Sequence, residues 1–329
     1  MIISQTPLRI SFVGGGTDLK SFYHKEEGIV LSAAIDKYVY IIVKERFDNK
    51  IYINYSQKER VEDVSEIQHE LVREAMKKAG VKGGLEITTL ADIPSQGSGL
   101  GSSSSVTVGL LNALYNYTGR QVTAEQLASE ACEIEIDICK KPIGKQDQYA
   151  AAYGGVNTIT FHPDERVTVS KLSLFNDNFL RFGSHLLLFY TNKTRKADVI
   201  LKKQKKDTES KRKVLRKMRS YVGPASTCII EGDFNGVGAI LHENWLLKKT
   251  LVNSISNSDI DKMYETALKA GAQGGKICGA GGGGFLLVFV QKDKQDSVRH
   301  ALRDYRELPF KLDHYGSRII FNIMRYPNK

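Results

Sequence analysis

The chain of 329 residues is 41% hydrophobic and 26% charged, and its mean hydropathy is slightly negative. These values are typical of a globular protein and exclude a disordered or fibrous chain. The sequence has neither the pattern of a secretory signal nor a stretch of about 18 apolar residues that could span a membrane, and its four cysteines show no CxxC spacing. We therefore expect a cytoplasmic protein with no membrane partner, no disulfide framework and no zinc site.

The net charge of +10 comes from one segment. Residues 193–219 hold thirteen Lys and Arg against three Asp and Glu, so the rest of the chain is neutral. Apolar residues at 214, 215, 218 and 222 recur at helical spacing, which predicts amphipathic helices with a solvated basic face. Because no aromatic residues are interleaved in a recognised module, we expect no nucleic-acid partner. The leading cations, Arg195 and Lys196, are instead candidates for attracting an anionic substrate.

The predicted elements alternate between strands and helices along the chain. Strands are expected at 38–43, 51–55, 84–94 (strand plus loop), 186–190, 285–290 and 319–324. Helices are expected at 64–79, from the end of a Gly/Ser run to Gly119, and at 124–139, 260–270 and 297–305. Mixed elements in both halves favour an α+β protein with two domains, residues 1–178 and 179–329, which meet in the polar stretch 170–185.

A glycine- and serine-rich run at 94–105 lies between a predicted strand and a predicted helix. Glycines allow the backbone to approach phosphate oxygens closely, and the helix that follows presents free N–H groups and a partial positive charge. The run therefore predicts a polyphosphate-binding loop, although it matches neither GxxxxGKS/T nor GxGxxG. The hydroxyls of Ser102 and Ser103 are candidates for contacts with phosphate or Mg²⁺, which prefers oxygen ligands.

Two further glycine runs lie near the two ends of the chain. The run at 276–284 contains GxGxxG, but it enters a strand rather than a helix. We therefore interpret it as a close-packed wall against a ligand or another backbone, and not as a dinucleotide site. The run at 7–18 is a predicted strand that breaks into a glycine loop. There Arg9 offers a cationic fork, and Asp18 offers an acceptor suited to sugar hydroxyls.

The three glycine runs, in this order and spacing, resemble the three motifs of the GHMP kinases, named for galactokinase, homoserine kinase, mevalonate kinase and phosphomevalonate kinase. The resemblance extends from Pro7 to Gly284. It implies a two-domain GHMP kinase fold, with a ribosomal-protein-like N-terminal domain and a ferredoxin-like C-terminal domain. It also implies phosphoryl transfer from ATP, assisted by Mg²⁺, to an alcohol or phosphate acceptor.

The resemblance also implies roles for individual residues. Asp147, in the run GKQDQYAA, would take the proton of the acceptor hydroxyl, while Lys145 would lower the pKa of Asp147 and Arg9 would stabilise developing charge. Glu135 and Ser103 would hold Mg²⁺. The residues expected to bind ATP are Pro94, Gly97, Gly99, Leu100, Gly101, Ser102, Ser103 and Ser104. The residues expected to bind the substrate are Gly15, Gly16, Thr17, Asp18, Arg195, Lys196, Gly281 and Gly282.

Within the family, the GGGTD and GKQDQYAA runs and residues 194–197 look most like bacterial kinases of D-glycero-D-manno-heptose 7-phosphate. Those enzymes phosphorylate the anomeric hydroxyl to give the 1,7-bisphosphate for nucleotide-heptose synthesis. Galactose is disfavoured because GGGTD stands where galactokinases carry GEHTD. Two alternatives remain, a fucokinase-like kinase of a neutral sugar and a catalytically silent sugar sensor of the same fold. The sequence leaves a homodimer open.

Overall fold

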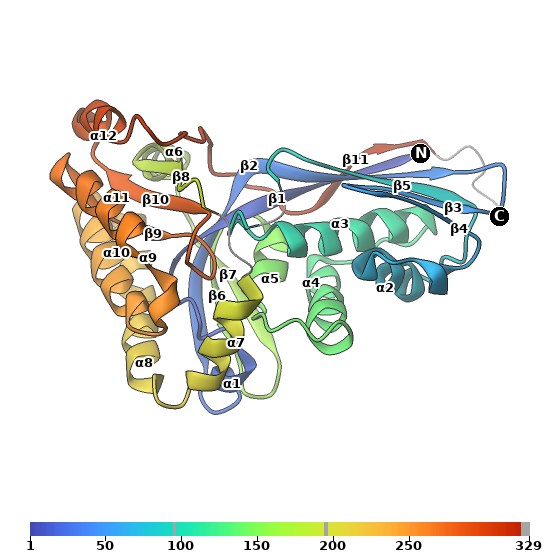
Figure 1. The fold of residues 1–329 in the computed structure, drawn as a ribbon, viewed down its shortest axis with the longest axis horizontal. Coiled ribbons are helices and arrows are strands. Elements are labelled where there is room, and N and C mark those ends of the chain that lie inside the picture. Colours follow the sequence, from blue (N-terminus) through green and yellow to red (C-terminus); the bar gives the residue numbers. More distant parts are fainter. Residues whose placement is uncertain (95–96, 194–196, 324–329) are drawn as a thin grey trace.

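The computed structural model describes residues 1–94, 97–193 and 197–323. The molecule is elongated, with a large sheet covered by helices at one end and a small sheet packed with helices at the other (Figure 1). The large sheet has the strand order β11-β1-β2-β5-β3-β4, and β6 pairs with both β2 and β7. Its strands are β1 (Ile2–Val13), β2 (Gly28–Glu45), β3 (Ile51–Asn54), β4 (Lys58–Val61), β5 (Leu85–Ala91), β6 (Val156–Phe161), β7 (Val167–Lys171) and β11 (Arg318–Asn322).

Strands β1 and β2 form the long antiparallel pair that connects the two ends of the molecule (Figure 1). Burial alternates over the first residues of β1 and becomes continuous over its second half, because that half is covered on both faces. Helices α3 and α5 contact β1, and so does α10 of the C-terminal part. Arg9 lies in this fully buried half, so its charge is carried into the centre of the molecule.

The helices of the N-terminal part lie on one side of the large sheet (Figure 1). The helix predicted at 64–79 is divided into a 3₁₀ turn and α2, which ends at the left-handed Gly80. The helix predicted at 124–139 is also divided, since α4 continues into a π-helix, η2. These helices are α1 (Lys20–Tyr23), η1 (Val64–Glu66), α2 (Glu70–Ala79), α3 (Ser102–Tyr117), α4 (Ala124–Cys132), η2 (Glu133–Ile138) and α5 (Gln146–Tyr153).

The C-terminal part is built on a three-stranded antiparallel sheet of order β8-β10-β9. The basic segment forms α7 and α8 as predicted, with Leu215 and Met218 buried in a hydrophobic core that also contains Trp245 and Val288. The strands are β8 (Leu186–Tyr190), β9 (Ala272–Ile277) and β10 (Phe285–Val290). The helices are α6 (Asn176–Ser184), α7 (Ala197–Asp207), α8 (Arg212–Ser220), α9 (Val222–Glu231), α10 (Phe234–Lys249), η3 (Asn253–Ile255), α11 (Ser258–Lys269), η4 (Lys292–Lys294) and α12 (Gln295–Ala301).

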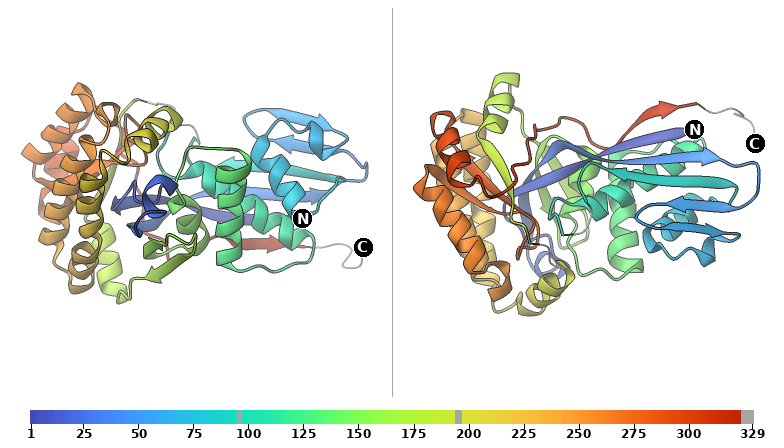
Figure 2. Two further views of the ribbon diagram at one scale, coloured as in Figure 1. Left: turned by 90° about the horizontal axis from the view of Figure 1, so that it is seen from below. Right: turned by 45° about the horizontal axis from the view of Figure 1, so that its top comes forward.

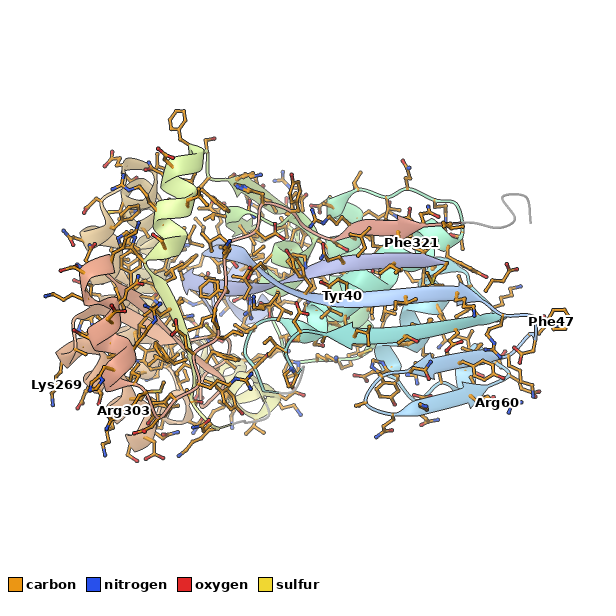
Figure 3. All side chains as sticks on the ribbon, turned by 90° about the horizontal axis from the view of Figure 1, so that it is seen from above. Tyr40, Phe47, Arg60, Lys269, Arg303 and Phe321 are labelled. Atoms are coloured by element: carbon orange, nitrogen blue, oxygen red, sulfur yellow. The ribbon has the colours of Figure 1, made fainter. Side chains whose placement is uncertain are left out.

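The last strand returns to the first sheet. β11 pairs antiparallel with β1, with Ile2 opposite Asn322, so the strand predicted at 319–324 is present but packs with the N-terminal part (Figure 2). The sheet face opposite the helices carries Tyr40 of β2 and Phe321 of β11, whereas Lys269 and Arg303 lie at the far end of the molecule (Figure 3). Across the described residues, no helix combines the length and apolar character needed to cross a membrane.

Candidate active site

The glycine run at 97–101 forms a tight loop that ends at the first turn of α3. Gly97, Gly99 and Gly101 have left-handed φ angles of 73°, 72° and 80°, which side chains rarely adopt. A Cβ on Gly99 would lie 2.5 Å from the carbonyl oxygen of Cys278, and a Cβ on Gly279 would lie 2.7 Å from Cα of Gly99. The predicted wall is therefore confirmed, because the third glycine run packs backbone to backbone against the loop.

Arg9 connects this loop to Asp147. Its Nε and Nη2 donate to Oδ1 and Oδ2 of Asp147, at 2.7 Å each. Its Nη1 donates to the Gly99 carbonyl oxygen at 2.6 Å, and its backbone N–H donates to the Leu100 carbonyl oxygen at 2.9 Å. The guanidinium fork therefore fixes the Asp147 carboxylate at a set distance from the loop.

Asp147 lies in the first turn of α5, where the partial positive charge of the helix N-terminus favours a carboxylate. Its side chain is 30% exposed, whereas the side chain of Arg9 is 5% exposed. A carboxylate has about four acceptor positions, and the two hydrogen bonds from Arg9 leave others for a ligand. Asp147 can therefore accept a hydrogen bond from a hydroxyl group in the adjacent cavity.

Glu135 is the second buried carboxylate of the site. It belongs to the π-helix η2 and is fully buried. Oε1 accepts from the Ser103 hydroxyl, and Oε2 accepts from the Ser104 hydroxyl and from Nε2 of Gln148, at 2.7 Å in each case. Burial raises the pKa of Glu135, and Lys141 and these donors oppose the rise.

The oxygen atoms around Glu135 fit a hard divalent cation. The Glu135 carboxylate and the Ser103 hydroxyl are adjacent at the N-terminus of α3, and both are ligand types that Mg²⁺ accepts. Lys141 lies 3.7 Å from Oε1 of Glu135 and donates to the Ser103 hydroxyl at 3.1 Å. The described residues contain no group of three or more His, Cys, Asp or Glu that could hold a metal. A cation here would therefore need phosphate and water oxygens to complete its coordination.

An open cavity lies beside Asp147, and we call it the acceptor cavity. Gly15, Gly16 and Asp18 of the first glycine run line it, and their role in substrate binding stays a prediction. The Asp18 carboxylate accepts from the Gly16 N–H at 2.9 Å, and burial followed by the charge of Asp147 raises the pKa of Asp18. The whole lining is Arg9, Ser11, Gly15, Gly16, Asp18, Leu19, Ile143, Gly144, Gln146, Asp147, Leu201, Gln204, Lys248, Gly279 and Ala280.

Other predicted residues lie elsewhere. Lys145 forms no hydrogen bond with Asp147; its ammonium pairs with Glu165 and lines a separate cavity instead. Thr17 is fully buried, and its hydroxyl donates to the carbonyl oxygens of Gly14 and Ile29, which fixes the loop rather than facing the cavity.

Gly281 and Gly282 pack against Ile255 and do not line the acceptor cavity. Pro94 is exposed at the edge of the loop. Two predicted substrate-binding residues, Arg195 and Lys196, lie outside the described residues.

The sequence did not indicate three side chains that the structure brings to the site. Lys141 and Gln148 contact Glu135, and Lys248 lines the acceptor cavity. The sequence could have indicated Lys141 and Gln148 as candidate site residues, because each is within six residues of Asp147. No pattern in the sequence distinguishes Lys248 as a site residue, since it is one lysine among several in the C-terminal helices.

Two family models match the chain, and curated relatives are similar to it along most of its length. Residues 66–155 match the N-terminal domain of GHMP kinases, and residues 225–307 match the C-terminal domain. D-glycero-alpha-D-manno-heptose 7-phosphate kinase of Campylobacter jejuni is 32% identical over 319 residues, which cover 92% of this chain and 93% of the relative. Galactokinase of Pyrococcus furiosus is 27% identical, with coverage of 92% and 93%.

Solved structures show the same fold. A D-glycero-D-manno-heptose 1-phosphate kinase from Bacteroides thetaiotaomicron has a TM-score of 0.83 at 24% identity, covering 98% of this chain and 100% of that one. A putative sugar kinase from Campylobacter jejuni has a TM-score of 0.76 at 28% identity, covering 97% of each chain. The expected two-domain fold is confirmed. The 32% identity over 92% of the chain makes the protein a homologue of a heptose-phosphate kinase. The chain therefore belongs to the GHMP kinases, a family whose phosphate donor is ATP.

Proposed function

We propose that the protein transfers the γ-phosphoryl group of ATP to the anomeric hydroxyl of D-glycero-D-manno-heptose 7-phosphate and so forms the 1,7-bisphosphate. The observation that carries the proposal is the position of Arg9, which holds Asp147 of the acceptor cavity against the glycine loop at the start of α3. The similarity to a heptose 7-phosphate kinase along 92% of the chain supports the choice of sugar.

The nucleotide phosphates would lie on the loop at 97–101 and on the N-terminus of α3. Free N–H groups and the helix dipole favour negative charge there, and the glycines leave room for phosphate oxygens. The acceptor hydroxyl would lie beside Asp147, which positions its oxygen and accepts its proton as that oxygen attacks the γ-phosphorus. The bond from the γ-phosphorus to the bridging oxygen breaks, and ADP leaves.

Two further charges would assist this transfer. Arg9 contacts both the loop and Asp147, which supports a role in stabilising the negative charge that would develop between donor and acceptor. Ser103 and Glu135 would hold Mg²⁺, and the bound ion would neutralise charge on the nucleotide phosphates. Gln148 and Ser104 would keep the Glu135 carboxylate in place through their 2.7 Å hydrogen bonds.

The test is an ADP-release assay with Mg-ATP and a panel of acceptors, followed by phosphorus NMR of the product. The panel contains heptose 7-phosphate, heptose 1-phosphate, unphosphorylated heptose, L-fucose, galactose and mevalonate. We expect the highest kcat/KM with heptose 7-phosphate and a new phosphorus signal on the anomeric carbon.

Other results would contradict the proposal in different ways. Faster turnover of fucose or unphosphorylated heptose would assign the protein to a neutral-sugar kinase. A product phosphorylated away from the anomeric carbon would overturn the reaction position. ATP binding without ADP release for any acceptor would favour a catalytically silent sugar sensor.

A further inference from the structure

Lys248 places a buried cation in the wall of the acceptor cavity. It is the penultimate residue of α10, it is 6% exposed, and it lines the cavity together with Arg9 and Asp18. Its ammonium donates to the Gly279 carbonyl oxygen at 2.6 Å. An ammonium can donate three hydrogen bonds, so this contact leaves donor capacity toward the cavity.

In the described part of the chain the Lys248 ammonium forms no salt bridge, although the Asp18 carboxylate lines the same cavity and raises the pKa of Lys248. Arg9, by contrast, is neutralised by Asp147. The adjacent Lys249 pairs with Asp261 at 3.1 Å and does not line the cavity. Burying an ammonium without a directly paired opposite charge is unfavourable. The pKa of Lys248 is lowered accordingly, first by burial and then by the nearby charges of Lys276 and Arg9. Cys278 and Asp18 oppose this shift.

Lys276 does not share this role, although it is also buried close by. Its ammonium donates to the Ser11 carbonyl oxygen at 2.6 Å, and it does not line the acceptor cavity. Gln204 of α7 does line the cavity, and its Nε2 lies directly above Gly16, where a Cβ would be only 2.3 Å away. The cavity therefore combines a lysine without a salt-bridge partner, the Asp18 carboxylate and a neutral amide from another helix.

We propose that Lys248 is a specificity-determining residue whose ammonium binds the phosphate group that the acceptor sugar already carries. A phosphate dianion would supply the direct ion-pair partner that Lys248 lacks, so a phosphorylated sugar gains an interaction that a neutral sugar does not make. This inference rests on the proposed function and deepens it, because it assigns the recognition of the phosphorylated acceptor to a residue of α10.

The test compares Lys248→Met with Lys249→Met. Both variants remove one positive charge from the same end of α10, but only the first removes it from the cavity. We expect Lys248→Met to raise the KM for heptose 7-phosphate about 10- to 100-fold, as for the loss of a hydrogen bond to a charged group. Its KM for ATP stays at the wild-type value, and its kcat/KM for unphosphorylated heptose falls much less than its kcat/KM for heptose 7-phosphate. Lys249→Met keeps all three parameters.

Thermal unfolding separates this role from a structural one. Because the methionine side chain removes an uncompensated buried charge, Lys248→Met is expected to have a higher Tm than the wild type in the absence of ligand. A lysine that serves only to hold the Gly279 backbone would instead give a lower Tm on replacement.

A binding measurement distinguishes failure of this inference from failure of the proposed function. Trp245 is the only tryptophan of the chain and lies three residues before Lys248 on α10, so its fluorescence reports on this helix. Without ATP, heptose 7-phosphate and inorganic phosphate are titrated into both variants and the wild type. Binding that depends on Lys248 supports the inference even if no heptose is turned over.

Two results would overturn the inference. One is equal affinity of the wild type and Lys248→Met for heptose 7-phosphate. The other is a loss that appears in the KM for ATP or equally in the kcat of phosphorylated and neutral sugars, which would assign Lys248 to the phosphates of the nucleotide.

Discussion

The Arg9 guanidinium and the Asp147 carboxylate, 138 residues apart in the sequence, face each other through two hydrogen bonds of 2.7 Å. Because the same guanidinium also holds the Gly99 carbonyl oxygen, the ion pair ties the acceptor cavity to the glycine loop. Substitutions of Asp147, of a loop glycine or of a nearby buried charged residue should therefore affect different measurable properties of the protein.

Replacing Asp147 with asparagine keeps the shape of the side chain but removes its charge and most of its basicity. We expect kcat for the sugar acceptor to fall about 10²- to 10⁴-fold, the usual contribution of general acid–base catalysis. ATP binding should persist, because Asp147 makes its hydrogen bonds with Arg9 and Gln146 and not with the loop. Steady-state kinetics and ATP titration check both statements. Asp137→Asn, an exposed change nearby, is the matched control.

Replacing Glu135 with glutamine should weaken the use of Mg²⁺. A neutral amide is a poorer ligand, and its NH₂ group would face either the Ser103 donor or the Ser104 and Gln148 donors. We expect the free Mg²⁺ concentration for half-maximal activity to rise about 10-fold or more. Glu133→Gln is the control, because that carboxylate lies on the same π-helix but pairs with Lys78. An unchanged Mg²⁺ dependence in Glu135→Gln would remove this residue from the metal site.

Replacing Gly99 with alanine tests the close approach of the two glycine runs. The new Cβ would lie 2.5 Å from the Cys278 carbonyl oxygen. Because the Cβ is fixed to the loop backbone and the oxygen belongs to the backbone of the third glycine run, they can separate only if the loop shifts. Gly119→Ala has nearly the same φ of 73° but nothing within 4 Å of the new Cβ. We expect both variants to lose about 1 kcal/mol or more of stability from backbone strain. The KM for ATP should rise only in Gly99→Ala, and equal ATP kinetics would argue against a phosphate role for the loop.

Lys276 predicts a stability change with pH. Burial lowers its pKa from 10.5 to about 8 in the folded protein. Between these values the unfolded chain binds more protons than the folded one, so this group makes stability rise with pH from about 8 to about 10.5. The rise is on the order of 3 kcal/mol at most. Urea unfolding from pH 7 to pH 10 should show a smaller rise in Lys276→Met than in the wild type, and parallel profiles would contradict the prediction.

Local patterns in the sequence were enough for the elements and for the family. Alternating and helical periodicities predicted most strands and helices, because these depend on which residues face a core over a few turns. The Gly/Ser run predicted a phosphate loop before α3, since glycine conformation and helix N-termini are local properties. The third glycine run was correctly interpreted as a close-packed wall for the same reason.

Contacts between distant segments were decided only by the tertiary structure. The pairing of β11 with β1 brings the end of the chain back to its beginning, and no local pattern encodes that choice. The π-helix rotates Glu135 toward the serines of α3, whereas Glu130 pairs with Tyr115 and Glu133 with Lys78.

The roles of the buried lysines also depend on the tertiary structure and not on local sequence patterns. The sequence singled out Lys145, which pairs with Glu165, and gave no reason to single out Lys248, which lines the acceptor cavity. The sequence does not show whether a given lysine is solvated, paired or buried without a partner. Its role depends on desolvation and on charges brought close by folding, so only the packed structure determines it.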